Sequence, residues 1–231
     1  MNDQKSTKGL IIAISVILIW LAHLIYILTS VEVSAFNSWM YLHILIQGHL
    51  FTGLFITGHD GMHGTIKPGH ATTNRLTGTI ASFLYAGLSF KKLKKNHRKH
   101  HETPATEEDP DYCTRSGNFF VWYFTFMWRY VTIWQILIMA ALFNILLIWF
   151  SEARLILLWI VPAFLSTFQM FYFGVFAPHR QPHLQEMRPY RSRTMKRNHL
   201  LAFLACWFFG YHYEHHASPG TPWWQLYAKK G

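Results

Sequence analysis

Four long stretches without any Asp, Glu, Lys or Arg limit the fold of this chain more than any other feature. They span residues 9–29, 39–58, 131–150 and 155–178. Each has about 20 residues or more, which is enough for an α-helix to cross a hydrocarbon core of roughly 30 Å. Charged residues make up only 14% of the 231-residue sequence, against about 25% in a soluble domain. We therefore predict an all-α integral membrane protein, a single domain over residues 1–231, with four transmembrane helices in two hairpins.

The positions of the basic residues predict how these helices are oriented. Lys5 and Lys8 precede the first stretch, "KKLKKNHRK" separates the second from the third, and residues 180–197 follow the fourth. The two opposite connections, "SVEVSAFNS" and "SEAR", contain one base between them. Because Lys and Arg concentrate in cytoplasmic loops, we expect both termini and the large loops to be cytoplasmic.

The net charge of +10 then follows from topology, and no nucleic-acid partner is needed to explain it. The basic runs either anchor to anionic lipid head groups or bind an acidic protein.

Two further apolar segments, residues 76–90 and 200–210, are too short to cross a bilayer. We expect them to form half-buried helices at the membrane face, which together with the charged loops make a cytoplasmic helical cap. The first long stretch exceeds the length of a signal-peptide core and is expected to remain as an anchor.

Histidines are concentrated in three clusters, all on the predicted cytoplasmic side. They are His59 and His63 in "HDGMH", His97, His100 and His101 in "HRKHH", and His212, His215 and His216 in "HYEHH". Residues at i, i+3 and i+4 share one face of a helix, so each cluster presents its imidazoles in one direction, as metal binding requires. Eight imidazoles are too many for one four-ligand zinc ion and suit two metals. Imidazole alone does not select among zinc, copper, iron and nickel.

A ninth candidate ligand is His179 in "FAPHR", where the fourth stretch reaches the cytoplasmic face. The alternative for this residue is an interfacial histidine beside Arg180. His43 and His49 lie inside the second stretch and are expected to be packed polar residues.

Acidic residues close to the clusters are candidates for holding the rings in place, because metal-bound histidines usually donate their second N–H to a carboxylate or carbonyl. The four candidates are Asp60, Asp109, Asp111 and Glu214. For the segment "DPD" that contains two of them, an acidic turn is an equally good interpretation.

Several motifs together resemble the bacterial and cyanobacterial β-carotene 4-ketolases, a family of the membrane fatty-acid desaturase and hydroxylase superfamily. The motifs are "HDGMHGT", "HRKHH" followed by "TEEDPDY", "FGVFAPHR", and "GYHYEHH" followed by "PWWQL". The histidine clusters alone indicate the superfamily, whereas "DPDY", "FGVFAPHR" and "HYEHHASPGTPWW" are specific to the ketolases. The resemblance covers nearly the whole chain.

This resemblance implies a non-haem centre of two iron ions (Fe²⁺), with molecular oxygen and reduced ferredoxin as co-substrates. Carried over position by position, the iron ligands are His59, His63, His97, His100, His101, His179, His212, His215 and His216. The implied reaction converts β-carotene through echinenone to canthaxanthin, by two successive C4 hydroxylations and loss of water on each β-ionone ring. Rings that carry a 3-hydroxyl group, as in zeaxanthin, remain a second possible substrate. The implied location is a bacterial inner membrane or a cyanobacterial membrane, with the active site on the cytoplasmic side.

Two further sets of residues have candidate roles in this reaction. An aromatic set is expected either to line a tunnel for the polyene or to anchor the chain at the membrane interface: Trp122, Tyr172, Trp223 and Trp224. A basic set is expected to attract an acidic ferredoxin over long range: Lys91, Lys92, Lys94 and Lys95.

Three alternatives compete with this interpretation. Carotenoid hydroxylation or acyl-chain desaturation would use the same kind of site. A metal transporter would need ionisable ligands near the middle of the membrane spans, whereas these clusters gather at one face. A structural protein with a zinc-bound cap predicts zinc and no oxygen-dependent activity.

Overall fold

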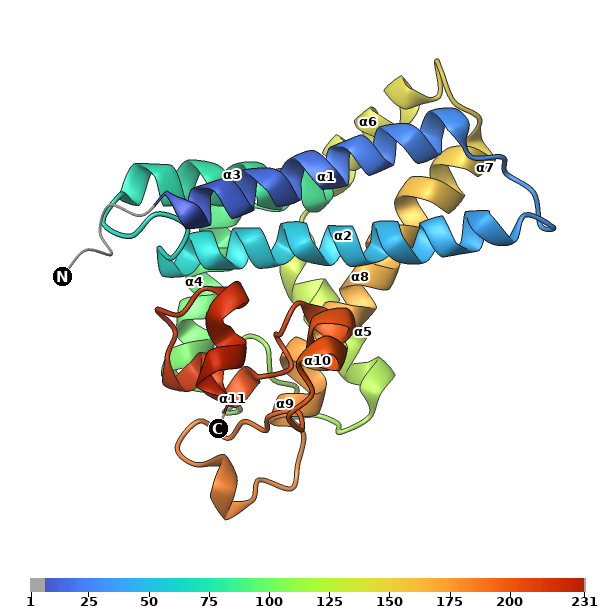
Figure 1. Ribbon diagram of the computed structural model, residues 1–231. Coiled ribbons are helices and arrows are strands. Elements are labelled where there is room, and N and C mark those ends of the chain that lie inside the picture. The colour runs from blue at the N-terminus through green and yellow to red at the C-terminus, as the bar shows by residue number, and fades with distance from the viewer. Residues whose placement is uncertain (1–6, 231) are drawn as a thin grey trace.

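The structure is a computed structural model that describes residues 7–230, and every regular element in that range is helical (Figure 1). Three helices within it are long and apolar enough to cross a membrane. They are α1 (Lys8–Ser30), α2 (Ser38–His63) and a 28-residue helix over Glu152–His179. The last comprises α7 (Glu152–Leu155), the π-helical turn η2 (Ile156–Ile160), α8 (Val161–Phe171), the π-helical turn η3 (Tyr172–Phe176) and α9 (Ala177–His179).

The prediction of an integral membrane protein is thus supported for the first, second and fourth stretches, whose helices lie close to the expected ranges. The second helix continues five residues beyond residue 58, so that "HDGMH" lies in its last turns. Lys5, which the orientation argument uses, lies outside the described residues.

The third predicted membrane helix, residues 131–150, is not a single straight helix. Instead, α5 (Phe119–Tyr130) and α6 (Ile133–Leu146) meet at an angle of 88°. Between them Val131 and Thr132 have extended backbones, and the Thr132 hydroxyl accepts a hydrogen bond from the Gln135 N–H at 3.2 Å. A capping side chain of this kind starts a new helix. The 14-residue α6 is shorter than the roughly 20 residues that a crossing needs, so a fourth span exists only if the bent pair counts as one.

The helix α2 is the centre of the fold, because it packs against α1, α8 and α3 (Ala71–Ala86). Glycines bring α2 and α3 together: a Cβ atom on Gly61 would lie 2.9 Å from Gly78 Cα and 2.9 Å from the Asn74 carbonyl oxygen. On Gly78 itself, a Cβ would lie 2.3 Å from the Phe90 ring. Close approach through small residues is the usual means of packing helices inside a membrane. It sets the position of the last turn of α2.

Arg154 in "SEAR" has a structural role at the opposite end of the helices. Its Nη1 donates hydrogen bonds to the carbonyl oxygens of Ile27, Leu28 and Val31, at 3.3, 3.1 and 2.6 Å. The last carbonyl groups of a helix have no hydrogen-bond partner within the helix. A cation at this end also interacts favourably with the helix dipole. The one base in the connections on this side is therefore used as a cap for α1.

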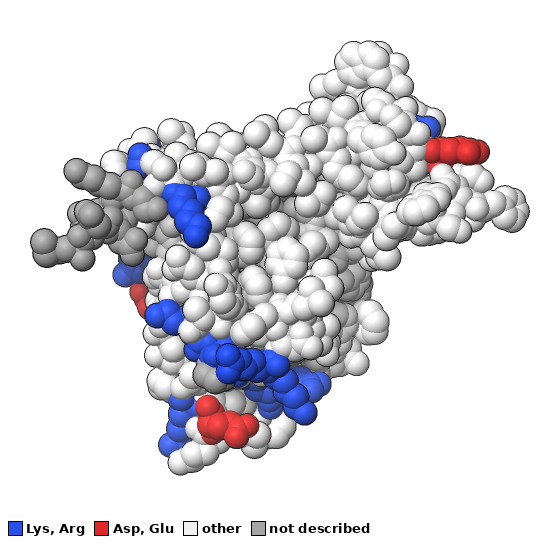
Figure 2. Space-filling model, in the orientation of Figure 1, with Lys and Arg blue, Asp and Glu red and all other residues white. Residues whose placement is uncertain are grey.

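A set of shorter helices lies below α2 in Figure 1, and this part of the molecule is called the cap. They are α4 (Phe90–Glu102), η4 (Gln185–Met187), α10 (His199–Cys206), α11 (His212–Ala217) and η5 (Trp223–Lys229). The segments predicted as half-buried helices correspond to α3 and α10, but their limits differ. The helix α3 ends at Ala86, and Gly87, which has a positive φ of 65°, is its C-terminal cap. Figure 2 shows Lys and Arg gathered at the left and lower parts of the molecule, whereas the arm formed by α1 and α2 is nearly free of charge until its far end.

Replacement of Gly78 by Val is expected to destabilise the fold, because the added side chain must displace the Phe90 ring. Overpacking of this kind costs about 1–3 kcal/mol, which should appear as a lower unfolding temperature in detergent. The matched control is Gly117→Val, because a Cβ at residue 117 meets no atom within 4 Å. Equal unfolding temperatures for the two variants would contradict the packing described above.

Candidate metal centre

All nine histidines predicted as ligands lie together in the structure, although they come from four separate elements. The last turns of α2 contribute two, α4 contributes three, α9 one and α11 three. The helical spacing of each cluster turns its rings toward the same space beneath α2. There eight of them form two groups of four, with one nitrogen of each ring within 4.8 Å of the others in its group.

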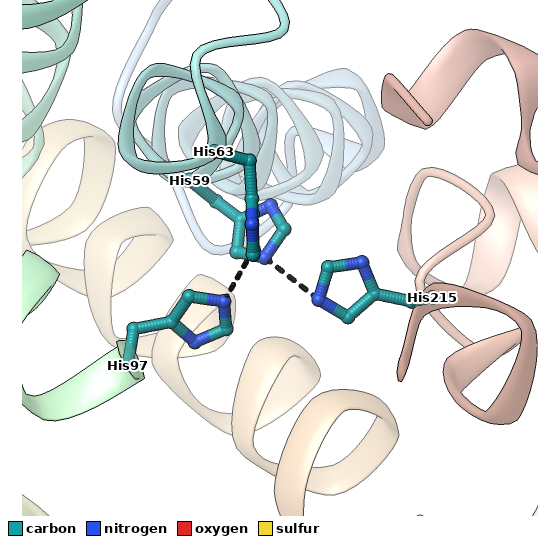
Figure 3. Close-up of side chains that lie close together, drawn as sticks. All are labelled: His59, His63, His97 and His215. Atoms are coloured by element: carbon teal, nitrogen blue, oxygen red, sulfur yellow. Dashed lines mark hydrogen bonds between the residues drawn. The ribbon is translucent and has the colours of Figure 1, made fainter. Parts of the chain in front are cut away.

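The first group consists of His59, His63, His97 and His215 (Figure 3). The Nε2 atoms of His63 and His97 lie 2.7 Å apart, and those of His59 and His215 lie 3.2 Å apart. Figure 3 shows two rings descending from α2 while the others approach from opposite sides. The four rings thus face a common centre.

The second group consists of His100, His179, His212 and His216, all of them buried. The Nε2 atom of His216 lies 3.1 Å from that of His100 and 3.2 Å from that of His212. His101 belongs to neither group but lies between them. Its Nε2 is 3.1 Å from that of His97 and 2.9 Å from that of His215, and its ring centroid is 4.3 Å from that of His216.

These distances fit the coordination of metal ions. Metal–imidazole bonds measure about 2.1 Å, so ligand nitrogens at right angles around an ion lie about 3 Å apart. The Nε2 atom of His179 is buried and has no hydrogen-bond partner among the described residues. Because Nδ1 carries the hydrogen, Nε2 offers a free lone pair to a metal ion held by the second group.

The protonation state of the rings also suits a metal. Burial, followed by the repulsion of neighbouring imidazoles, holds the pKa values of His97, His212 and His215 well below the usual range. The same causes lower the pKa of His101 to about 2. These four rings are thus neutral at physiological pH, which is the form that binds metal ions.

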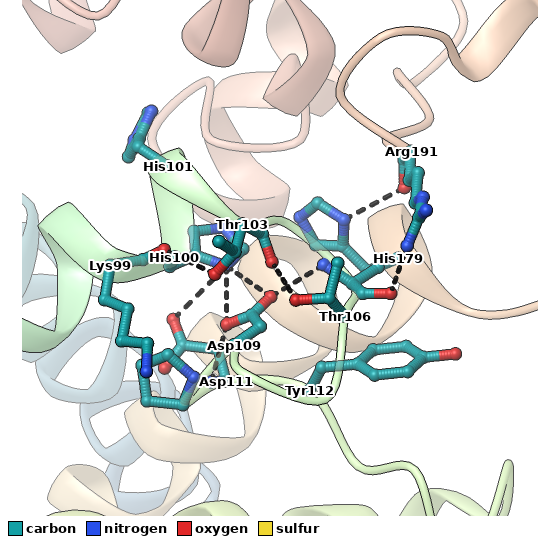
Figure 4. Close-up of polar contacts among 12 residues, drawn as sticks. Lys99, His100, His101, Thr103, Thr106, Asp109, Asp111, Tyr112, His179 and Arg191 are labelled. Atoms are coloured by element: carbon teal, nitrogen blue, oxygen red, sulfur yellow. Dashed lines mark hydrogen bonds and ion pairs between the residues drawn. The ribbon is translucent and has the colours of Figure 1, made fainter.

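His100 is held by a carboxylate from outside the group (Figure 4). Its Nδ1 donates to Asp109, at 2.9 Å from Oδ2 and 3.1 Å from Oδ1, and the carboxylate also accepts from the N–H groups of Ala105 and Asp111 at 2.8 Å. Burial lowers the pKa of His100, but the Asp109 carboxylate outweighs this effect and raises it overall. Asp109 thus fixes the orientation of the ring, with Nε2 toward the metal position.

His179 is held by a backbone carbonyl instead. Its Nδ1 donates to the Arg191 carbonyl oxygen at 3.0 Å, as Figure 4 also shows. The sequence contains no signal for this contact, because any residue can supply a carbonyl group.

The other three candidate acids have different surroundings. Asp111 lies 3.9 Å from His100 Nδ1 and accepts a short hydrogen bond from the Tyr130 hydroxyl. Asp60 lies 3.7 Å from His59 Nδ1 and accepts the Trp223 N–H.

Glu214 has no histidine partner among the described residues. Its carboxylate accepts from the Thr194 hydroxyl at 2.6 Å and pairs with Lys230 at 3.3 Å. The expectation that it holds a ligand ring is corrected accordingly: on the short helix α11 it points to the connection before α10 and to the C-terminal segment.

A cavity of about 520 Å³ leads to both histidine groups, with walls formed by α2, α3, α5, α6 and α8. His59, His97, His100 and His212 lie on its wall, and the rest of the lining is mostly apolar. Such a volume is typical of small-molecule sites.

None of the four aromatic residues expected along a tunnel lies on the wall of this cavity, as far as the described chain shows. Trp122 is buried with its Nε1 bonded to the Asp111 carbonyl at 2.7 Å, Tyr172 is 41% exposed, and Trp223 packs on Trp207. Trp224 lies against α1, where a Cβ on Gly9 would touch its ring. The aromatic and thioether groups that do line the cavity are Phe55, Met62, Tyr85, Phe126, Met127, Tyr130, Met139, Phe143, Phe164, Met170 and Phe209.

The remaining histidines of the membrane helices stay apart from this site, as expected. His43 bonds with His23, and the ring of His49 stacks on Trp207.

A helical membrane protein with a buried, two-part histidine site is the class that these observations define. Comparison with known proteins makes the class specific. The family model for fatty acid desaturases matches residues 36–135 and 126–230. The beta-carotene ketolase of Paracoccus sp. (strain PC1) is 34% identical over 228 residues, which is 97% of this chain and 92% of that protein. The zeaxanthin 4-ketolase of Chlamydomonas reinhardtii is 35% identical over 96% of this chain, and the beta-carotene ketolase of Haematococcus lacustris is 36% identical over 80%.

The chain therefore belongs to the fatty acid desaturase family and, within it, to the β-carotene ketolases. It spans 53% of the length of the Chlamydomonas protein and 61% of that from Haematococcus. No solved structure matches it significantly.

Replacement of Asp109 by Asn should weaken metal binding about 10- to 100-fold, the usual effect of removing the partner of a ligating histidine. The amide keeps the shape of the side chain but removes the charge that faces His100 Nδ1. The measurement is the metal content of the purified protein after dialysis against a graded series of chelator concentrations. Glu214→Gln, a change of the same kind at an acid without a histidine partner, should retain metal as the wild type does.

Proposed function

We propose that this chain is a di-iron carotenoid 4-ketolase, acting as one catalytic domain over residues 1–231. The observation that carries this proposal is the convergence of nine buried or half-buried imidazoles, eight of them in two groups and His101 between the groups, at the end of an apolar cavity. The names of relatives that are 31–36% identical to this chain give further support.

In this proposal each histidine group holds one iron ion (Fe²⁺). His59, His63, His97 and His215 bind the first, and His100, His179, His212 and His216 bind the second. His101, which contacts both groups, is the ninth ligand. The iron ions would supply the activation of molecular oxygen that takes a hydrogen from a C4 methylene, a reaction beyond any side chain.

The protein around the metal centre has two tasks. The apolar walls of the cavity bind the hydrocarbon, keep water away and direct one β-ionone ring toward the histidines. Asp109 and the Arg191 carbonyl keep His100 and His179 in position while the substrate enters and leaves. The substrate is β-carotene or zeaxanthin, and for β-carotene two C4 hydroxylations and loss of water on each ring lead through echinenone to canthaxanthin.

The proposed setting is a bacterial or cyanobacterial membrane, with both termini and the cap on the cytoplasmic side and reduced ferredoxin as the electron donor. Support comes from the charge distribution, since the bases gather around the cap in Figure 2 while Arg154 serves as a helix cap at the other end.

Expression in cells that accumulate β-carotene tests the proposed activity. The wild type should produce echinenone and canthaxanthin, identified by chromatography and mass. His215→Ala should leave β-carotene unaltered, because the ring belongs to the first group and contacts His101 as well. The matched control is His70→Ala, since His70 is exposed and outside both groups.

Each alternative predicts a different product in this experiment. An alcohol would indicate a hydroxylase, and a new double bond in the acyl lipids would indicate a desaturase. Normal ketone formation by the His215 variant would overturn the ligand assignment.

Turnover with reduced ferredoxin should fall steeply as the salt concentration rises from about 0.01 to 0.15 M, because the Debye length shrinks from about 30 to 8 Å over this range. Lys91, Lys94 and Lys95 are exposed on α4 and can act over such distances. Lys92 is half-buried and donates to the Tyr130 carbonyl at 3.3 Å. The initial rate of ketone formation at a limiting ferredoxin concentration is the quantity to measure. A flat salt response would remove the idea of electrostatic attraction.

A further inference from the structure

A second cavity, unrelated to the apolar one, opens in the cap. It has a volume of about 830 Å³ and lies between the segments 105–114 and 181–191. Its wall is polar, with contributions from Gln181, His183, Arg188, Arg191 and Tyr112. A hydrocarbon substrate has no use for such a wall, so the polar pocket is available for a different partner.

The wall of the polar pocket is also the outer support of the second histidine group. Arg191 lines the pocket, and its carbonyl oxygen accepts the Nδ1–H of His179 at 3.0 Å. His183 lines the pocket as well, and its Nε2 bonds the His179 carbonyl oxygen at 2.8 Å. On the opposite wall, Ala105 donates its N–H to Asp109, the partner of His100. One layer of residues therefore separates the pocket from two proposed iron ligands.

The segment that frames the polar pocket is strongly basic. Residues 180–197 include six bases and one acid, Glu186. Arg188 and Arg191 lie on the pocket wall, against the single acid Glu107. Arg193 ties the segment together by donating to the carbonyl oxygens of Arg180 and Pro182. The pocket thus presents positive charge on a shaped surface.

The position of this segment favours a protein partner over lipid head groups. In Figure 1 the loop between α9 and α10 lies at the tip of the cap, on the side away from α1 and α2. Head groups would instead be met by the basic residues nearer to the membrane helices.

We propose that the polar pocket is the docking and electron-entry site for an acidic protein that carries an iron–sulfur centre. The inference rests on the proposed function, and it places the contact at Arg188 and the pocket rather than on the lysine-rich face of α4. In each encounter the iron–sulfur centre would lose one electron, and the iron that the second histidine group would hold would gain it, with no bond formed or broken. The hydrogen bond from His179 to the Arg191 carbonyl connects the pocket wall directly to a proposed ligand ring.

Binding of ferredoxin to the iron-loaded full-length protein tests this site independently of turnover. The protein is placed in nanodiscs of neutral phosphatidylcholine, and the Kd of an oxidised, acidic plant-type ferredoxin is measured at low salt. Arg188→Glu should raise the Kd at least 10-fold. Arg75→Glu, at an exposed residue of α3, serves as the control and should change the Kd less than 3-fold. Lys94→Glu on α4 is measured for comparison and should raise the Kd less than Arg188→Glu does.

A second measurement separates docking from chemistry. Ketone formation driven by dithionite-reduced methyl viologen, a small cationic donor that needs no docking, should be the same for the wild type and Arg188→Glu. Only the ferredoxin-driven rate at limiting donor should fall. A variant that loses both rates has a structural defect, which would be evidence against a docking role.

Three results would overturn the proposal. The first is an unchanged Kd for Arg188→Glu. The second is an equal loss of ferredoxin affinity for Arg75→Glu, which would indicate that only net charge matters. The third is a larger loss of ferredoxin affinity for Lys94→Glu, which would place docking on α4. If the wild type bound anionic vesicles more tightly than Arg188→Glu did, while both bound ferredoxin equally well, the segment would be assigned to lipid binding. A failure of the proposed ketolase activity would appear differently, as an absence of ketone with either donor while ferredoxin still binds through Arg188.

Discussion

Imidazole nitrogens that face one another across about 3 Å in a buried space are the interaction on which the rest of this structure depends. A neutral imidazole nitrogen offers either one hydrogen or one lone pair. The Nε2 of His101 faces those of both His97 and His215, and it cannot satisfy two such neighbours at once. Protonation offers no solution, because it would place like charges together away from water. Cations coordinated by the rings of each group would remove both penalties, which is why the site makes physical sense as a metal centre.

The fold serves this gathering of rings by bringing rigid elements to one place. Helix α2 delivers two histidines in its last turns, and its close packing against α3 through Gly61 and Gly78 leaves that end little freedom. His100 and His179 are also oriented from outside, by Asp109 and by the Arg191 carbonyl. By contrast, the Nδ1 atoms of His212, His215 and His216 have no hydrogen-bond partner among the described residues. The second group is thus partly built before any metal binds.

The two cavities approach the histidines from different environments. The apolar cavity reaches His59, His97, His100 and His212 from the side of the membrane helices, where a hydrocarbon is soluble. The polar pocket lies on the cap side, and its wall residues Arg191 and Ala105 connect it to His179 and, through Asp109, to His100. Under the proposed function, this separation lets an oily substrate and an aqueous electron donor serve one centre without competing for the same opening.

Local pattern was enough to predict much of this protein. Runs without charge located three membrane helices within a few residues, and the i, i+3, i+4 spacing placed the eight histidines of the three clusters on faces that do converge. Both features depend only on near neighbours along the chain. The bend at Val131 and Thr132 was missed, because an unbroken apolar run looks the same whether or not a cap interrupts it.

The tertiary structure alone decided which groups meet. Residues 34 positions apart, His63 and His97, and 156 positions apart, His59 and His215, come into contact through helix packing that no local pattern records. Because of the same packing, Asp109 contacts a histidine and Glu214 does not. For the same reason, Phe55 and Phe126 line the cavity and Trp122 does not. The sequence by itself therefore determined the membrane helices and the direction of each histidine cluster, since these follow from helical periodicity and the cost of charge in a bilayer. The partners of each ring and the shape of both cavities were left to the close packing of helices from distant parts of the chain.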